Sequence, residues 1–180
     1  MKKALLRKVK IPEGVSVSIN GEDVNIKGPE GEVSRKFNLG KVNISVKEKE
    51  IVLENGKATK NEKKVMNTIY SHIKNMVKGV QTQFEYRLKI CFGHFPFTVK
   101  QEGKKIMIKN FLGEKVDRIL EVPDGVDVEI KKEIITVKSP NKELAGQASA
   151  NFETATRIRG RDKRTFQDGI YIIEKGGKRK

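Results

Sequence analysis

The sequence of 180 residues is 36% hydrophobic and 34% charged, a balance that is typical of a folded chain with a heavily charged surface and excludes a disordered one. Thirty-eight Lys and Arg residues against 23 Asp and Glu residues give a net charge of +15 at pH 7, which favours an anionic partner. No apolar run approaches the roughly 20 residues of a membrane span, and Met1–Lys10 lacks the apolar centre of a signal peptide. We therefore expect a cytoplasmic protein, with nucleic acid rather than a membrane as its partner.

The first part of the chain is patterned for antiparallel hairpins. Apolar and polar residues alternate from Val15 to Ile19, an Asn-Gly pair follows, and the alternation resumes at Val24. This pattern predicts a hairpin with one buried face. A second hairpin is predicted over residues 42–53, across a polar KEKE turn.

A helix is predicted over residues 60–80, where apolar residues recur at helical spacing. Thr59 and Glu62 are spaced as a capping box at its start, and Gly79 lies near its end. We interpret the side opposite the apolar residues as a solvated face, with an RNA-facing surface as the alternative. Five lysines gather on that side: Lys60, Lys63, Lys64, Lys74 and Lys78.

The same order of patterns recurs in the second half of the chain. Apolar and glycine positions in residues 17–32 match those in residues 99–114 at an offset of 82. Positions in residues 42–53 match those in residues 126–137 at an offset of 84, and a second helical pattern follows, opened by Ser139-Pro140-Asn141.

These patterns predict an α+β protein of two tandem duplicated modules, each an antiparallel β-sheet packed against one α-helix. We expect the first module to span residues 1–82 and the second to span residues 83–174. Residues 175–180 are expected to form a basic C-terminal tail.

Catalytic and metal chemistry find little support in the sequence. A serine or cysteine nucleophile needs a base, and the chain has only His72 and His94, neither with an evident orienting group. Together with the single cysteine, Cys91, they are too few soft ligands for a zinc site. We expect no enzyme activity, metal, cofactor or small-molecule substrate. The alternatives are an RNA-processing or RNA-modifying enzyme that uses Asp162, Asp168 or His94, and a general basic interaction module.

Basic residues concentrate at the C-terminal end of the sequence. Residues 157–180 contain nine cations against three acids, a net charge of +6. A guanidinium group binds a phosphate through two hydrogen bonds. The apolar residues Phe166, Ile170 and Ile172 follow the first five of these cations with the alternation of a packed strand, which would hold the arginines in place. We predict that the second module carries the main RNA-binding surface, with these cations in it: Arg157, Arg159, Arg161, Lys163, Arg164, Lys175, Lys178, Arg179 and Lys180.

Several motifs in a fixed order resemble a known family. The C-terminal "RGRDKRTFQDGIYIIEK" is preceded by "IKGPEGEV", "HIKNMVKGV", "FEYRLKICFGHFPFTV" and "IKNFLGEK". Together they resemble the family of large-subunit ribosomal protein number six in its archaeal and eukaryotic form, and the resemblance covers essentially the whole chain. One departure is Thr154, where the family usually has glutamine.

The resemblance implies two duplicated α+β domains and a non-enzymatic, structural role in the cytoplasmic ribosome. It implies large-subunit ribosomal RNA and neighbouring ribosomal proteins as partners. It further implies binding near the stem that carries the sarcin–ricin loop, chiefly through the second domain. Asn110, Lys115 and His94 are additional RNA-binding candidates on the same ground.

Overall fold

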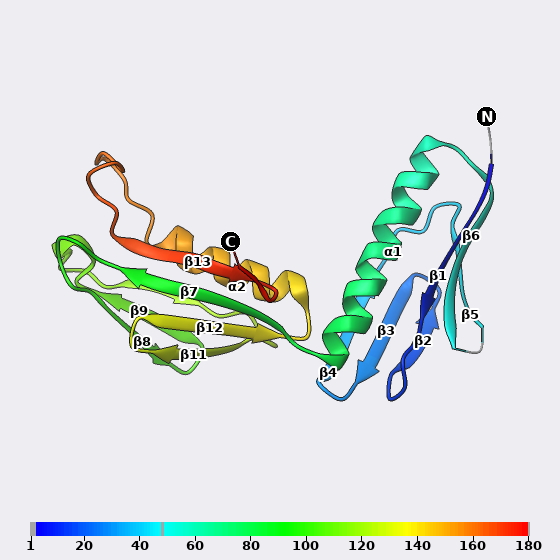
Figure 1. Cartoon of the computed structure of the whole chain (residues 1–180), viewed down its shortest axis with the longest axis horizontal. Helices are drawn as coiled ribbons and strands as arrows, with labels where there is room; N and C mark the ends of the chain where they lie inside the picture. The colour runs from blue at the N-terminus through cyan, green and yellow to red at the C-terminus, as the bar shows by residue number, and fades with distance from the viewer. Residues whose placement is uncertain (1–2, 48, 180) are drawn as a thin grey trace. The chain divides into compact units, whose positions relative to one another are not determined.

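Two compact units make up the chain, unit 1 at residues 1–83 and unit 2 at residues 84–180. The computed structural model describes residues 3–47 and 49–179. Each unit contains one α-helix and two antiparallel sheets (Figure 1), whereas the pattern predicts one sheet per module. The structure confirms the predicted α+β class with duplicated halves.

Unit 1 combines two three-stranded sheets with helix α1. The strand orders are β1-β6-β5 and β2-β3-β4, and both predicted hairpins are present as β2–β3 and β5–β6. Side chains from both sheets and from α1 form one core, with Ile26, Leu53 and Ile73 fully buried. The elements are β1 (Lys3–Lys10), β2 (Ser16–Asn20), β3 (Asp23–Gly28), β4 (Gly31–Lys36), β5 (Asn43–Lys47), β6 (Glu50–Ala58) and α1 (Lys60–Gln81).

Helix α1 begins with the predicted capping box. The amide and the hydroxyl of Thr59 both donate to the carboxylate of Glu62, the amide at 2.8 Å, and these hydrogen bonds lower the pKa of Glu62. Near the other end of α1, the amide of Glu30 donates to the carbonyl oxygen of Val80 at 3.0 Å. A Cβ atom on Gly28 would lie 2.7 Å from that oxygen, so this approach of the β3–β4 turn requires glycine.

Unit 2 repeats this arrangement and extends it. Strands β7, β12 and β11 are ordered like β1, β6 and β5, and β8-β9-β10 like β2-β3-β4. The larger sheet continues beyond β7 in the order β11-β12-β7-β13-β14. The elements are β7 (Phe84–Cys91), β8 (Thr98–Glu102), β9 (Lys105–Lys109), the short 3-10 helix η1 (Phe111–Gly113), β10 (Arg118–Glu121), β11 (Asp127–Lys131), β12 (Ile134–Ser139), α2 (Lys142–Ala155), β13 (Gly169–Lys175) and β14 (Lys178–Arg179).

Strand β13 is held on both sides. On one side it pairs antiparallel with β7. On the other, the amide of Ile170 donates to Thr156 Oγ1 at 2.9 Å, and the amide of Ile172 donates to Glu153 Oε1 at 3.1 Å. Both isoleucines are buried in the core of unit 2. Side chains from α2 and its end therefore satisfy backbone amides that would otherwise lie at an open sheet edge.

The predicted tail, residues 175–180, is a short hairpin in its described part. Lys175 pairs with Lys178 across a turn at Gly176 and Gly177. Both glycines have positive φ, +56° and +78°, a conformation that glycine adopts without steric cost. Lys180 lies outside the described residues.

Candidate nucleic-acid interface

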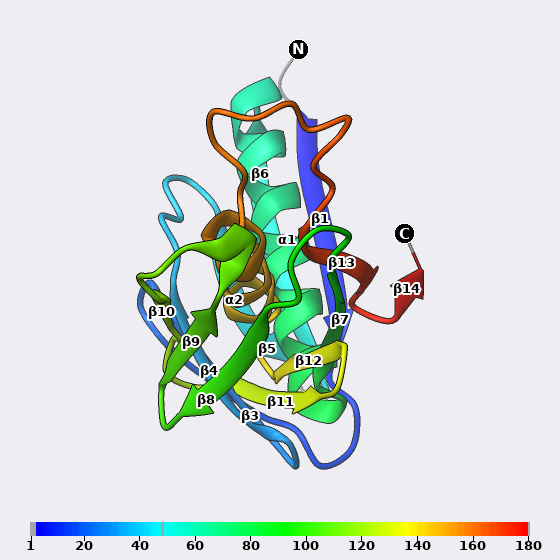
Figure 2. The same cartoon turned by 90° about the vertical axis from the view of Figure 1, so that its left-hand side faces the viewer.

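The segment between α2 and β13 gathers five predicted site residues on one loop, residues 157–168, which we call the arginine loop. It projects from the sheet of unit 2 in both views (Figures 1 and 2). Ile158, at its start, is buried in the core and attaches the loop to the unit. The predicted cations on it are all exposed: Arg157, Arg159, Arg161, Lys163 and Arg164.

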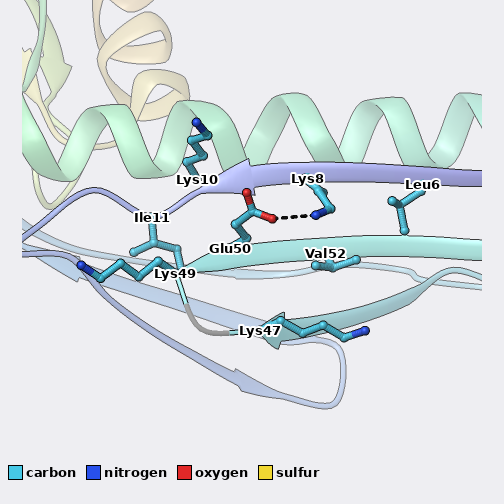
Figure 3. A pocket seen from close by; sticks show the side chains of 8 residues that line it. All are labelled: Leu6, Lys8, Lys10, Ile11, Lys47, Lys49, Glu50 and Val52. Carbon is cyan, nitrogen blue, oxygen red and sulfur yellow. Dashed lines mark ion pairs between the residues drawn. The ribbon is translucent and has the colours of Figure 1, made fainter.

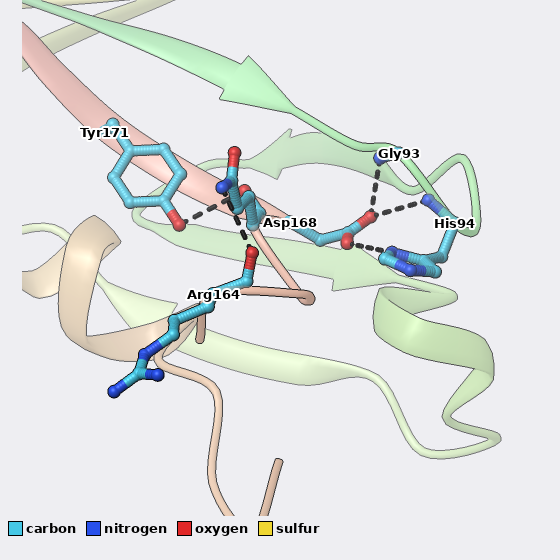
Figure 4. Close-up of polar contacts among 6 residues, drawn as sticks. Gly93, His94, Arg164, Asp168 and Tyr171 are labelled. Atoms are coloured by element: carbon cyan, nitrogen blue, oxygen red, sulfur yellow. Dashed lines mark hydrogen bonds and ion pairs between the residues drawn. The ribbon is translucent and has the colours of Figure 1, made fainter. Parts of the chain in front are cut away.

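A row of four side chains, those of Asp168, His94, Phe166 and Arg161, anchors the other end of the arginine loop. Figure 4 shows the contacts of Asp168 with Gly93 and His94. His94 Nδ1 lies 2.6 Å from Asp168 Oδ2, and Asp168 Oδ1 accepts hydrogen bonds from the amides of Gly93 at 2.8 Å and His94 at 3.1 Å. The ring of Phe166 stacks on that of His94 with the centroids 4.4 Å apart. The guanidinium carbon of Arg161 lies 4.8 Å from the Phe166 centroid, within the range of a cation–π contact.

Asp168 is the charged group at the base of this row. Burial alone would raise its pKa, but hydrogen bonds from the amide and ring of His94 and from the amide of Gly93 lower the pKa from 3.8 to about 2. The Asp168 side chain is only 1% exposed. It is therefore a positioning residue rather than the accessible carboxylate that the alternative of an RNA-processing enzyme requires.

Asp162 shapes the middle of the arginine loop. Its carboxylate accepts a hydrogen bond from the amide of Arg164 at 2.9 Å. Its carbonyl oxygen accepts from the amides of Thr165 at 3.2 Å and Phe166 at 2.9 Å. Asp162 thus forms the turn that presents Lys163 and Arg164, because an aspartate side chain readily bonds to the backbone two residues ahead.

Arg118 joins β10 to the start of the arginine loop. Its Nη1 donates to the carbonyl oxygen of Ala155 at 2.7 Å, and its guanidinium carbon lies 4.4 Å from the centroid of Phe111. A hydrogen bond from Arg118, followed by the charges of Arg118 and Arg161, lowers the pKa of Glu114. The sequence reasoning missed Arg118, whose carbonyl partner is 37 residues away along the chain.

The three additional candidates differ in what they contact. His94 belongs to the anchoring row, with its side chain 36% exposed. Asn110 donates from Nδ2 to the carbonyl oxygen of Pro96 at 3.0 Å, so it supports the loop that contains His94. Lys115 is exposed beside the Glu114–Arg118 ion pair.

Three further predicted cations, Lys175, Lys178 and Arg179, lie at the opposite end of β13. Lys175 is exposed at the end of the strand, and the backbones of Lys178 and Arg179 form β14. A strand rises about 3.3 Å per residue, so the two ends of β13 lie roughly 20 Å apart. The structure therefore separates these three cations on the terminal hairpin from the five cations of the arginine loop.

Unit 1 has a hollow of about 610 Å³ beside β1 and β6 (Figure 3). Lys8, one of the four lysines that line it, forms an ion pair with Glu50 at 3.0 Å. The apolar part of the lining consists of Leu6, Ile11 and Val52. Aliphatic side chains, lysines and Glu50 thus line this hollow, and the described residues of its lining include neither an aromatic ring nor an arginine.

Within residues 3–47 and 49–179, no group of three or more His, Cys, Asp or Glu side chains is placed to hold a metal ion. No helix in the same described ranges is long and apolar enough to cross a membrane. The chain is thus a duplicated, cationic α+β protein, one unit of which presents exposed arginines on an anchored loop.

Comparison with known proteins identifies the family. The profile of the family described as "Ribosomal protein L6" matches residues 11–83 and again residues 95–169. The chain is 46% identical over 172 residues to "Large ribosomal subunit protein uL6" of Methanobrevibacter smithii, covering 96% of this chain and 97% of the relative. The uL6 proteins of Methanothrix thermoacetophila and Nanoarchaeum equitans are 42% and 46% identical, with 97% and 94% of this chain and 99% and 93% of the relatives covered.

The chain belongs to the ribosomal protein L6 family. This result confirms the resemblance that the motifs indicate. The family consists of structural ribosomal proteins and not of enzymes, so the expectation of a non-enzymatic ribosomal protein is confirmed as well.

Proposed function

We propose that this protein is a structural component of the large ribosomal subunit in the cytoplasm, where its arginine loop binds ribosomal RNA. The observation that carries the proposal is a loop of five exposed cations held by the row of Arg161, Phe166, His94 and Asp168. The relatives are named as proteins of the large ribosomal subunit, and these names support the proposal that this chain is a component of the same subunit.

The proposed mechanism is neutralisation of phosphates by preorganised guanidinium groups. Closely packed RNA segments repel each other, and a cation held between them offsets that repulsion. Asp168 orders the loop before RNA arrives, because its hydrogen bonds to Gly93 and His94 exist within the protein alone. Less conformational entropy is then lost on binding.

Recognition is expected to depend on RNA shape more than on sequence. The major groove of an A-form RNA helix is too narrow for side chains, so phosphates and 2′-hydroxyl groups are the accessible contacts. Binding near the sarcin–ricin stem, with neighbouring ribosomal proteins as further partners, is the finer part of the proposal. It is supported by the family resemblance.

The test compares two double variants that remove the same charge. Arg161→Ala/Arg164→Ala changes the arginine loop, and Lys64→Ala/Lys74→Ala changes exposed lysines on α1. Binding to a large-subunit rRNA fragment is measured across a salt series for both variants and for the unchanged protein. The arginine variant is expected to bind about 10- to 100-fold more weakly, and the slope of log affinity against log salt falls by about 2.

The lysine variant should bind like the unchanged protein, because we interpret the lysine stripe as a solvated face. Equal losses in the two variants would contradict a dedicated arginine surface and favour a general basic interaction module. Divalent-metal-dependent RNA cleavage by the purified protein would instead support the enzyme alternative.

A further inference from the structure

We propose that a hollow beside the arginine loop holds one unpaired nucleobase of the bound RNA. This inference rests on the proposed function. The hollow has a volume of about 660 Å³ and lies between the residues that follow β7 and those that lead into β13. That volume is in the range of pockets that bind small organic groups.

Two aromatic side chains line the hollow, and each is 44% exposed: Phe92 and Tyr171. Exposed aromatic rings are the surfaces on which RNA-binding proteins stack unpaired bases. Each ring is supported by a fixed neighbour. Phe92 packs against buried Phe97 with the centroids 6.1 Å apart. Tyr171 lies so close to the backbone of Gly169 that a Cβ atom there would be 3.2 Å from its ring.

The hydroxyl group of Tyr171 fixes the ring further. It donates a hydrogen bond to the carbonyl oxygen of Gln167 at 3.2 Å (Figure 4). Tyr171 is therefore tied to the loop that carries the cations, so the ring and the loop hold one geometry. A ring that is already ordered loses little entropy when a base stacks on it.

Polar and charged groups complete the lining of the hollow. Lys163 belongs to the arginine loop and also lines the hollow, where Thr165 and Gln167 add hydroxyl and amide groups. A nucleotide needs this combination: an aromatic surface for its base, hydrogen-bonding groups for the base edge and a cation for its phosphate. The hollow in unit 1 combines lysines and Glu50 with aliphatic side chains, so the described part of its lining lacks an aromatic surface.

The position of Lys163 at the rim of the hollow indicates how a base of the bound RNA would reach it. Lys163 lies between Arg161 and Arg164 in the sequence, and all three are exposed. An RNA backbone that contacts these cations passes the rim at Lys163, and an unstacked base next to that phosphate can enter the hollow. A peptide side chain would use the aromatic walls but would leave the cationic rim without a phosphate.

The experiment uses the full chain and two RNA hairpins that differ by one bulged nucleotide. The bulged nucleotide is 2-aminopurine, whose fluorescence decreases when it stacks. The unchanged protein is expected to quench that fluorescence and to bind the bulged hairpin about tenfold more tightly than the fully paired one. The ratio of the two affinities should stay constant across a salt series, because both complexes use the same phosphate contacts.

Variants identify the hollow as the site. Phe92→Leu/Tyr171→Leu keeps apolar side chains but removes both rings, and it should reduce the ratio of the affinities for the bulged and the paired hairpin from about tenfold to about one. Tyr171→Phe, which retains the ring, should keep the preference. Phe95→Leu is the matched control, because Phe95 is 47% exposed in the same loop but does not line the hollow. Thermal unfolding of each variant verifies that it is folded.

The outcomes separate this inference from the proposed function. Binding to the paired hairpin without any preference for the bulge would overturn the nucleobase site and leave phosphate binding intact. A preference that survives in Phe92→Leu/Tyr171→Leu would overturn it too, since the base would then lie elsewhere. Failure to bind either hairpin would overturn both proposals.

Discussion

The two units share one fold but differ at one sheet edge. In unit 1, β1 pairs with β6 and has no second strand neighbour among the described residues. In unit 2, β13 pairs with β7, the strand that corresponds to β1. The arginine loop leads into β13. The fold thus occurs in both units, whereas only unit 2, among the described residues, has the added strand and the arginine loop that leads into it.

Net charge does not distinguish the two units. Residues 1–83 contain 17 Lys and Arg against 9 Asp and Glu, a net charge of +8, and residues 84–180 contain 21 against 14, a net charge of +7. The difference is in the type of cation, because unit 1 has two arginines and unit 2 has seven, four of them on the arginine loop. Guanidinium groups make bidentate contacts that ammonium groups cannot make, and this difference supports the proposal that the RNA-binding surface lies in unit 2.

The largest effect is expected from a charge in the added strand. Ile170, only 1% exposed, lies between β7 and the end of α2. Ile170→Asp should lower the free energy of unfolding of unit 2 by more than about 4 kcal/mol and so unfold this unit, because the carboxylate would be buried away from water. Unit 1 has its own core and should stay folded. Amide NMR spectra should then lose the dispersed signals of unit 2 only.

Ile170→Val is the control for that substitution and should lower the free energy of unfolding of unit 2 by about 1 kcal/mol. Loss of the dispersed signals of both units in Ile170→Asp would contradict independent cores.

The next largest effect is expected from acid, which should lower the stability of unit 2 by protonating Asp168. The pKa of Asp168 is about 2 in the folded protein, below the ordinary 3.8. The ionised carboxylate therefore stabilises unit 2 fully above pH 3.8, and this contribution is lost as the pH falls through 2. The shift corresponds to about 2 kcal/mol. Urea unfolding of unit 2 between pH 5 and pH 2 should show this loss, and Asp168→Asn should show less pH dependence. An unchanged pH dependence in the variant would rule out Asp168 as its source.

A smaller effect is expected at the start of the arginine loop. Arg118→Lys keeps the charge but loses the planar group that lies over Phe111 and bonds to Ala155. The free energy of unfolding of unit 2 should fall by about 1–2 kcal/mol. Arg87→Lys, at a half-exposed ion pair with Glu85, is the control and should change it by less than about 0.5 kcal/mol. Equal effects in urea titrations would argue against a special role for Arg118.

The smallest effect is expected in unit 1. Thr59→Ala removes the capping residue of α1 and should destabilise unit 1 by about 1 kcal/mol without affecting unit 2. Thr68→Ala serves as the control, because Thr68 is exposed within the same helix and its hydroxyl bonds to the helix carbonyl of Lys64. Chemical denaturation followed by helix circular dichroism measures both. A larger loss in Thr68→Ala would contradict the capping role.

Local structure could be read from local patterns. The capping box at Thr59, both hairpins of unit 1 and the two helices follow from residues close in sequence, because the periods of helices and strands are set by backbone geometry. The duplication followed from the same patterns recurring in the same order in the second half of the chain. The cations of the arginine loop were also evident as a cluster. The family followed from motifs spread along the chain.

The tertiary structure alone decided which distant residues meet. Asp168 and His94 are 74 residues apart, and Arg118 reaches Ala155 across 37 residues. No periodicity encodes such pairs. Whether β13 joins β7, and therefore where Phe166, Asp168 and Tyr171 lie, depends on a free sheet edge and on the core that buries Ile170. The sequence by itself determined the elements, the duplication and the cationic cluster, whereas long-range packing determined how that cluster is anchored and shaped.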